Sequence, residues 1–194
     1  MTTLTLFKED YLENHFGKCF IAINKGIGSI SDEEILQNEN QLPKLIERII
    51  QDNRFVPPTI SFEKEKVKVL PIQKDKAAFI KYSFPVDGSF QLLKYCPFSS
   101  DDRGWAISVQ IDSNVLSFEL DAAYATIDFS PEKKKEIAAR ILAASQWITM
   151  NLTGTKNAVE EYNTSLYGFI LPRLEARLNT AKKKEQNKID LNPF

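Results

Sequence analysis

The last third of the chain carries the most regular hydrophobic pattern. It opens with Ser130-Pro131-Glu132, a typical helix start, and apolar residues then recur at helical spacing. The repeating positions are Ile137, Ile141, Ala144, Ile148, Leu152, Val159, Tyr162, Leu166, Phe169, Ile170, Leu174 and Leu178. We therefore predict a long helical segment over residues 130–184, followed by a polar linker or tail over residues 185–194.

Two features predict breaks in this segment. Residues 151–155 are weak helix formers with a glycine suited to a helix end, which favours a turn and an antiparallel pair of helices. One continuous helical arm is the alternative. Pro172 removes a backbone hydrogen bond, so we expect a kink or a fresh helix start there.

The N-terminal part mixes two patterns. Residues from Leu4 to Phe16 suit a short helix, and the compact apolar run from Cys19 to Ile23 suits a strand. Ser31-Asp32-Glu33-Glu34 is a capping box, which predicts a helix beginning at Asp32. A second helical stripe runs from Leu42 to Ile50 and must end before Pro57-Pro58.

In the middle of the chain the hydrophobic period changes to two, which is typical of strands. We predict strands at residues 67–70, 77–84, 105–111 and 115–120, with the last two joined as a hairpin through Asp112-Ser113-Asn114. Strands in the middle and helices at both ends indicate an α+β fold. We expect a single domain over residues 1–184: an antiparallel sheet of about four to five strands packed with N-terminal helices and a long C-terminal helix pair.

Composition narrows the function classes. With 25 basic and 26 acidic side chains, the net charge of −1 gives no global attraction to nucleic acid or to an anionic membrane. The two cysteines lack the spacing of a zinc site, and no apolar run is long enough to cross a bilayer. We expect a cytoplasmic protein that does not bind a membrane.

Candidate chemistry is sparse. The single histidine, His15, has no metal-ligating neighbour at a suitable spacing, so a catalytic triad is not favoured. Glu132-Lys133-Lys134 and the run at residues 63–66 match nuclease elements only loosely and are better explained as solvated charge. Asp87-Gly88-Ser89 and the run at residues 101–104 are better explained as turns than as a pocket. We predict no cofactor and no catalytic, cofactor-binding or metal-binding residues. Enzyme activity is not favoured.

Two surfaces are candidates for binding. The apolar stripe of the C-terminal segment predicts an interface with a protein partner or with a second copy in a homodimer, through Ile148, Leu152, Tyr162, Leu166, Phe169 and Ile170. The alternative is that these side chains are buried within the chain. The basic end of the segment could contact phosphate through Lys182, Lys183 and Lys184, although nucleic-acid binding is less favoured than a solvated helix end.

The order of these elements resembles a known kind of module. The segments that carry the resemblance are residues 83–93, the hairpin at 105–120, residues 159–166 and the basic end at 173–184. They resemble N-terminal accessory modules that precede nuclease or Toll/interleukin-receptor-like effector domains in bacterial defence proteins. The resemblance implies a non-catalytic interaction or sensor module of a cytoplasmic bacterial protein in antiviral defence, and it implies no catalytic residues. The alternative is a metal-dependent phosphodiester hydrolase or nucleic-acid-binding protein with an unrecognised site.

Overall fold

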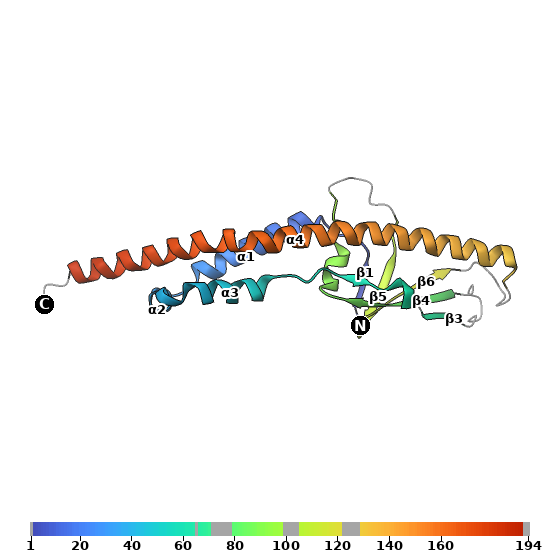
Figure 1. The fold of residues 1–194 in the computed structure, drawn as a ribbon, viewed down its shortest axis with the longest axis horizontal. Helices are drawn as coiled ribbons and strands as arrows, with labels where there is room; N and C mark the ends of the chain where they lie inside the picture. The colour runs from blue at the N-terminus through green and yellow to red at the C-terminus, as the bar shows by residue number, and fades with distance from the viewer. Residues whose placement is uncertain (1, 65, 71–78, 99–104, 122–128, 192–194) are drawn as a thin grey trace. The chain divides into compact units, whose positions relative to one another are not determined.

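The computed structural model describes residues 2–64, 66–70, 79–98, 105–121 and 129–191 (Figure 1). The chain divides into two compact units. The first, here called the sheet unit, comprises Met1–Leu12 and Val56–Ala158, and the second, the helical unit, comprises Glu13–Phe55 and Val159–Phe194. The expected α+β fold, with an antiparallel sheet and a long C-terminal helix, is confirmed. The expected single domain over residues 1–184 stays a prediction.

The sheet has the strand order β1-β5-β6-β4-β2, and β3 also pairs with β4. All of these pairs are antiparallel. The strands are β1 (Thr2–Thr5), β2 (Thr59–Ile60), β3 (Lys66–Leu70), β4 (Phe79–Asp87), β5 (Ser108–Asp112) and β6 (Val115–Asp121). The four predicted strands correspond to β3, β4, β5 and β6. Residues 77 and 78 lie outside the described residues, and the strand predicted from residue 105 was wrong at its start, because residues 105–107 are not in a strand and β5 begins at Ser108. The two strands not predicted, β1 and β2, are short.

The predicted hairpin between β5 and β6 is confirmed. Asp112 pairs with Val115, so only Ser113 and Asn114 form the turn. Both have positive φ angles, 48° and 62°. A two-residue turn with positive φ at both positions is type I′, whose twist matches that of antiparallel strands.

The two hairpin strands part soon after the turn. Their pairing extends from Asp112↔Val115 to Gln110↔Ser117. Beyond that point β5 pairs only with β1, through Thr5↔Ser108, while β6 stays paired with β4, through Lys81↔Glu119. Within the described residues, the sheet is therefore open between the first residues of β5 and the last residues of β6.

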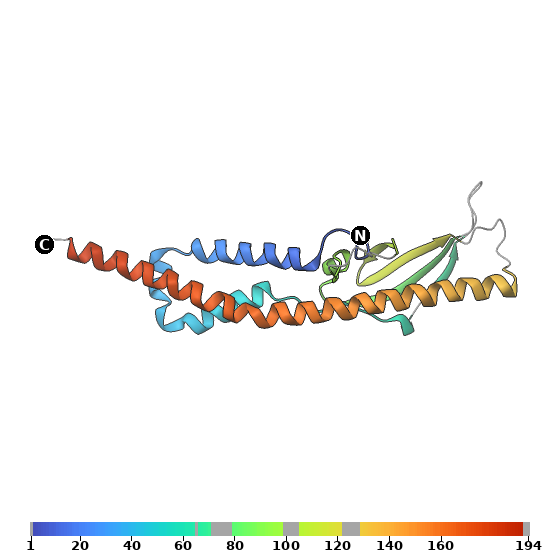
Figure 2. The same ribbon diagram turned by 90° about the horizontal axis from the view of Figure 1, so that it is seen from above.

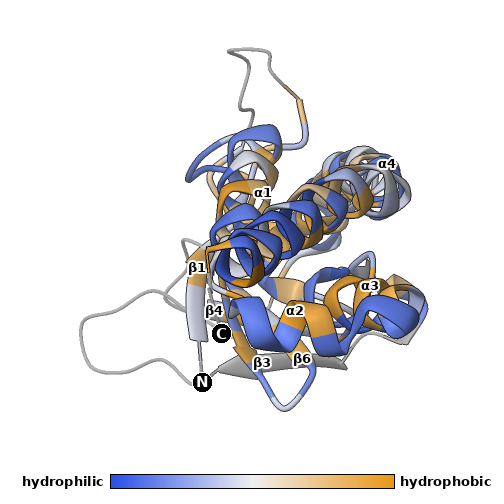
Figure 3. Ribbon diagram, turned by 90° about the vertical axis from the view of Figure 1, so that its left-hand side faces the viewer, coloured by the Kyte–Doolittle hydropathy of each residue, from blue (hydrophilic) through white to orange (hydrophobic). Residues whose placement is uncertain are grey.

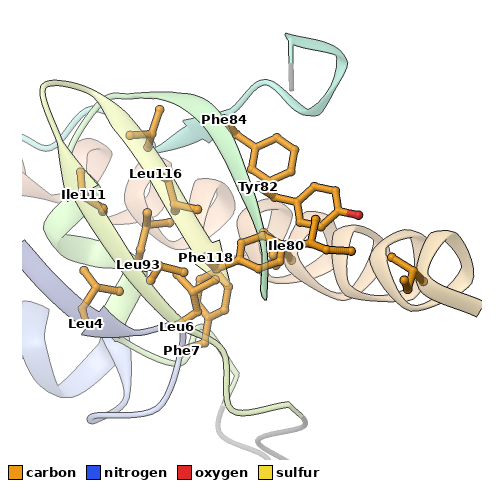
Figure 4. Packing of buried hydrophobic residues seen from close by; sticks show 14 residues of the cluster. Leu4, Leu6, Phe7, Ile80, Tyr82, Phe84, Leu93, Ile111, Leu116 and Phe118 are labelled. Carbon is orange, nitrogen blue, oxygen red and sulfur yellow. The ribbon is translucent and has the colours of Figure 1, made fainter. Parts of the chain in front are cut away.

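The core of the sheet unit follows the period-two pattern. Alternate residues of β4 are buried, with Tyr82 and Phe84 beside Phe118 of β6 (Figure 4). The Tyr82 and Phe118 ring centroids are 5.7 Å apart, and those of Phe84 and Phe118 are 5.8 Å apart. The other members of this cluster include Leu4, Leu6, Phe7, Leu93, Ile111, Leu116, Ile137 and Ile148. Apolar side chains from both ends of the unit's sequence therefore meet on one sheet face.

The prediction for the N-terminal part was wrong in order: a strand, β1, comes first and the helix α1 (Leu12–Gly28) follows. The run from Cys19 to Ile23 lies within α1, where Ile23 is buried and Ile21 is 71% exposed. One apolar residue of the run thus faces the core and another faces solvent, as helical geometry requires. Local pattern could not reveal β1, because its pairing partner β5 lies about a hundred residues further along the chain.

The next helices agree with the sequence. The helix α2 (Asp32–Gln37) begins after the Ser31 cap, whose hydroxyl accepts a hydrogen bond from the Glu34 amide at 3.0 Å. A short 3₁₀ turn, η1 (Glu39–Gln41), leads to α3 (Leu42–Asn53), which buries Leu45 and Ile46. Figure 3 shows apolar and polar residues on both helices, as expected for amphipathic segments.

The C-terminal segment is one helix, α4 (Pro131–Asp190), of 60 residues. The predicted turn at residues 151–155, and with it the helix pair, was wrong, and the helix also continues through Pro172. The polar side chains of the expected turn bond to the helix itself: the Asn151 amide donates to the Trp147 carbonyl at 2.9 Å and the Thr153 hydroxyl to the Thr149 carbonyl at 3.0 Å. Asn151 and Thr155 are also buried. Packing therefore outweighs their weak helix propensity. Residues 185–190, expected in the tail, are helical, and residues 192–194 lie outside the described residues.

Candidate interaction groove

The helical unit consists of α1, α2, α3 and the C-terminal half of α4, which runs alongside α1 (Figure 2). Aromatic rings join α1 to α4. Phe16 stacks on Tyr162 with ring centroids 4.4 Å apart, and Phe20 packs against Phe169 at 4.5 Å. On the α3 side, the Asn163 side chain pairs with the backbone of Phe55, donating to its carbonyl at 2.8 Å and accepting from its amide at 3.1 Å. The helix α4 therefore contacts both α1 and the segment that follows α3.

Arg177 of α4 fixes the connection between α1 and α2. Its guanidinium donates two hydrogen bonds to the Ile30 carbonyl, at 3.1 and 2.6 Å. It also forms an ion pair with Asp32 at 2.5 Å. The hydrogen bonds that Arg177 and then Lys184 donate to the Asp32 carboxylate hold the pKa of that carboxyl below its usual value. The Arg177 side chain thus fixes the position of the N-terminal end of α2.

A groove remains open between α1 and α3. Its volume is about 300 Å³. It is lined by Ala22, Ile23, Gly26, Ile27, Ile30, Leu45, Arg48, Ile49, Asp52 and Asn53. Phe16 and Phe20 point toward α4 at positions of α1 other than those that line the groove. The groove is therefore not the seam that α4 fills.

Small residues on α1 keep the groove open. Ala22 and Gly26 are exposed, whereas Ile23 and Ile27 on the same helix are buried. A Cβ atom placed on Gly26 would have no heavy atom within 4 Å. The wall at this point is therefore backbone, and a larger side chain would extend into free space.

The side chains that line the groove are mostly aliphatic, and its edge carries charged residues. Arg48 and Asp52 lie one helical turn apart on α3, and both line the groove. Arg48 also approaches Glu34 at 3.9 Å, in a solvent-exposed pair that contributes little. An apolar floor bordered by one positive and one negative side chain is suited to recognising an amphipathic helix.

The six predicted interface residues are mainly core residues of the single chain. Ile148, Tyr162, Leu166 and Ile170 are buried. Leu152 packs against the core of the sheet unit, and Phe169 is half-buried between Phe20 and the Arg173 guanidinium, which lies 3.5 Å from its ring centroid. A dimer through these side chains would require them to leave the core of their own chain.

The predicted phosphate contacts are engaged in ion pairs. Lys182 pairs with Glu39 of η1, and Lys184 pairs with Asp32 of α2 at 3.1 Å. Lys183, between them, is exposed. The basic end of α4 therefore contacts acidic residues of its own unit, and a phosphate would have to compete with them.

The single histidine lies near a thiol and a phenol in the helical unit. The Cys19 sulfur is 3.8 Å from the His15 Nε2 atom. Burial raises the pKa of the Cys19 thiol, which disfavours the reactive thiolate. Burial, and then the nearby Cys19, raises the pKa of Tyr162, whose buried hydroxyl has no good hydrogen-bond partner among the described residues. These three side chains are better explained as part of the packed core than as a catalytic group.

Among the described residues, no three His, Cys, Asp or Glu side chains are grouped closely enough to hold a metal ion. Glu132-Lys133-Lys134 lies at the start of α4, where Lys133 pairs with Glu136 at 2.8 Å. Residue 65 and the run at residues 101–104 lie outside the described residues. None of the described helices combines the length and the apolar character that spanning a bilayer requires.

Sequence reasoning missed the groove because residues 19–23 were assigned to a strand. Once α1 is known to be a helix, Ala22 and Gly26 fall one turn apart and mark a face with little side-chain bulk.

Comparisons with family models, curated proteins and solved structures gave no match for this chain.

Proposed function

We propose that the chain is a non-catalytic interaction module of a cytoplasmic bacterial protein, and that the groove between α1 and α3 receives an amphipathic helix of a partner protein. The observation that carries the proposal is the open aliphatic groove, whose α1 wall is formed at Gly26 by backbone alone. Helix-in-groove recognition uses apolar anchors at helical spacing, which this floor can accept.

The charged edge of the groove gives the partner an orientation. An acidic residue of the bound helix would face Arg48, and a basic residue one turn away would face Asp52. Complementary charges at the edge of an interface fix register and favour the right partner more than they add affinity. The partner is therefore an amphipathic helix with aliphatic anchors and one acidic and one basic residue beside them.

The resemblance to accessory modules of bacterial defence proteins gives the proposal a setting. In that setting the module would precede an effector domain and bring it to a partner during antiviral defence. The alternative, a phosphodiester hydrolase or a nucleic-acid-binding protein, is less favoured, because the described residues contain no group of three potential metal ligands and two of the three lysines near the end of α4 are engaged in ion pairs.

Peptide display tests the groove directly. The full chain would be used to select from a library of random 18-residue peptides, and the enriched peptides would then be measured by fluorescence anisotropy. We expect amphipathic sequences whose affinity falls about tenfold or more in Gly26→Leu, because the new side chain fills the groove.

Gly17→Leu is the matched control. It also lies in α1 with no heavy atom within 4 Å of an added Cβ, but it does not line the groove. It should leave binding unchanged. The charge-exchanged variant Arg48→Asp/Asp52→Arg should select peptides with the two charges in the opposite order. Absence of enrichment, or equal binding to the Gly26→Leu and Gly17→Leu variants, would reject the proposal.

A further inference from the structure

The opening between β5 and β6 coincides with a hollow in the sheet unit. Its volume is about 500 Å³, within the range of small-ligand sites. It is bordered by Trp105 and Ser108 before and at the start of β5, by Phe118 and Glu119 of β6, and by Arg140 and Ala144 of α4. A smaller hollow of about 210 Å³ on the polar face shares Ser108, Phe118 and Glu119. The same break in the sheet therefore opens to both faces.

Two features of the chain account for the hollow. The strands cease to pair beyond Gln110↔Ser117, so their facing backbone edges are not joined by ladder hydrogen bonds at Ser108 and Glu119. On α4, the buried residue at this point is Ala144, whereas Ile137 and Ile148 occupy the neighbouring buried positions. A small side chain therefore lies where a large one would fill the space.

The side chains around the hollow include one aromatic ring and two charged groups. Trp105 is 45% exposed, although tryptophan usually buries its large ring. Arg140 is exposed and approaches from α4, while Glu119 has Lys81 as its direct cross-strand neighbour. The nearby charges are thus Arg140 and Lys81 against Glu119, with Glu136 one helical turn before Arg140 on α4 and paired with Lys133 at 2.8 Å. An aromatic ring and an exposed guanidinium therefore border the same hollow.

We propose that this opening binds a nucleoside monophosphate, with the base stacked on Trp105 and the phosphate paired with Arg140. Indole faces stack on bases of any kind, and guanidinium groups bind phosphate through paired charge-assisted hydrogen bonds. The unpaired strand edges and the Ser108 hydroxyl offer donors and acceptors to the base and ribose. This site lies in the sheet unit and is independent of the groove proposed for protein binding.

Tryptophan fluorescence provides the test. The chain has two tryptophans, and Trp147→Phe leaves Trp105 as the reporter. AMP and GMP would be titrated into the full chain with this substitution, with adenosine and ribose 5-phosphate as probes that lack one half of the ligand. We expect saturable quenching by the monophosphates, and at least about tenfold weaker binding of either half alone.

Variants separate the two contacts. Arg140→Gln should weaken monophosphate binding about tenfold or more and leave adenosine binding unchanged. In the chain that retains both tryptophans, Trp105→Ala should weaken monophosphate binding about fivefold or more, as measured by calorimetry. Lys135→Gln, on an exposed part of α4 that does not border the hollow, is the control and should have no effect. Trp105 and Arg140 are exposed, so thermal unfolding should confirm that both variants fold.

Three outcomes would overturn the proposal. The first is the absence of saturable binding up to millimolar concentrations. The second is binding that Arg140→Gln and Lys135→Gln affect equally, which would show general charge attraction. The third is equal affinity for AMP and adenosine, which would leave the phosphate without a role.

Discussion

The two halves of α4 bury different kinds of side chain although they belong to one helix. In the sheet unit the buried positions are Ile137, Ala144, Ile148, Asn151 and Thr155. In the helical unit they are Val159, Tyr162, Leu166, Ile170, Leu174, Leu178 and Ala181. The first set includes small and polar residues, whereas the second places a large apolar residue at nearly every turn.

The surface that each half meets explains the difference. In the sheet unit a Cβ atom on Gly154 would lie 2.6 Å from the Phe98 ring, so the neighbouring segment approaches the helix backbone closely. In the helical unit α4 instead meets side chains of α1, with the Phe16 and Tyr162 ring centroids 4.4 Å apart and those of Phe20 and Phe169 4.5 Å apart. Helical periodicity thus identifies which face is buried, but the partner surface decides how large the residues on that face can be.

The largest expected effect comes from truncating one fully buried residue in each half. Ile148→Ala and Ile170→Ala should each lower the free energy of unfolding by about 2–5 kcal/mol, because each leaves a cavity. Chemical denaturation measures the loss. Leu142→Ala, at a position that is 58% exposed, is the control and should change stability by less than about 0.5 kcal/mol.

Hydrogen exchange on the same variants tests whether the halves belong to separate cooperative units. Ile170→Ala should reduce amide protection mainly in α1, α3 and the second half of α4, and Ile148→Ala mainly in the sheet. Equal loss of protection throughout the chain in both variants would instead support the single domain expected from the sequence.

A smaller effect of opposite sign is expected at Tyr162, in the second half of α4. Among the described residues its buried hydroxyl has no partner with good hydrogen-bond geometry, and the Cys19 thiol that interacts with it is a weak hydrogen-bond partner. Tyr162→Phe should therefore raise the free energy of unfolding by about 1 kcal/mol at neutral pH. A loss of stability in urea titrations would show that the hydroxyl makes a bond that the chain needs.

The pH dependence of stability gives a second test of Tyr162. Its pKa in the folded chain lies above the value of 10.0 for an exposed tyrosine. The unfolded chain therefore loses this proton at a lower pH than the folded chain does. The resulting contribution to the free energy of unfolding is complete below pH 10 and is lost as the pH rises above 10. Urea midpoints from pH 7 to 11.5 should fall less steeply in Tyr162→Phe than in the unchanged chain. If the urea midpoints of the two proteins change with pH in the same way, Tyr162 does not have a raised pKa in the folded chain.

The smallest effect separates the two glycines of α4. Gly168→Ala should stabilise the chain by about 0.5–1 kcal/mol, because alanine favours the helix and meets no obstacle. Gly154→Ala should gain less, since its methyl group must displace the Phe98 ring. Thermal unfolding of both, with Phe98→Ala added to each, measures the difference. If the two glycine substitutions act alike, the close approach at Gly154 is not real.

Sequence reasoning was reliable where a local signal determined the structure. The Ser31 capping box, the stripe of α3 and the turn at Ser113-Asn114 depend on residues within a few positions of one another. It failed where distant contacts outweigh local preference. Thr2–Thr5 becomes a strand by pairing with β5, and residues 151–155 remain helical because Asn151 and Thr155 are buried.

The candidate sites were the least accessible to sequence reasoning. The predicted interface residues were found from their apolar pattern, and that same pattern places most of them in the core. The residues that border the open spaces are inconspicuous in sequence. Gly26 and Ala144 matter through the side-chain volume that they lack, and Trp105 and Arg140 come together only through the parting of two strands.

The pairing of β1 with β5 constrains the order of folding. The β5–β6 hairpin closes over two residues and can form in microseconds, whereas pairing Thr2 with Ile111 closes a loop of about a hundred residues. During synthesis β1 leaves the ribosome first and must wait until β5 has emerged. Until β1 pairs with it, one edge of β5 lacks a partner strand, so the N-terminal strand protects that edge from pairing with another chain.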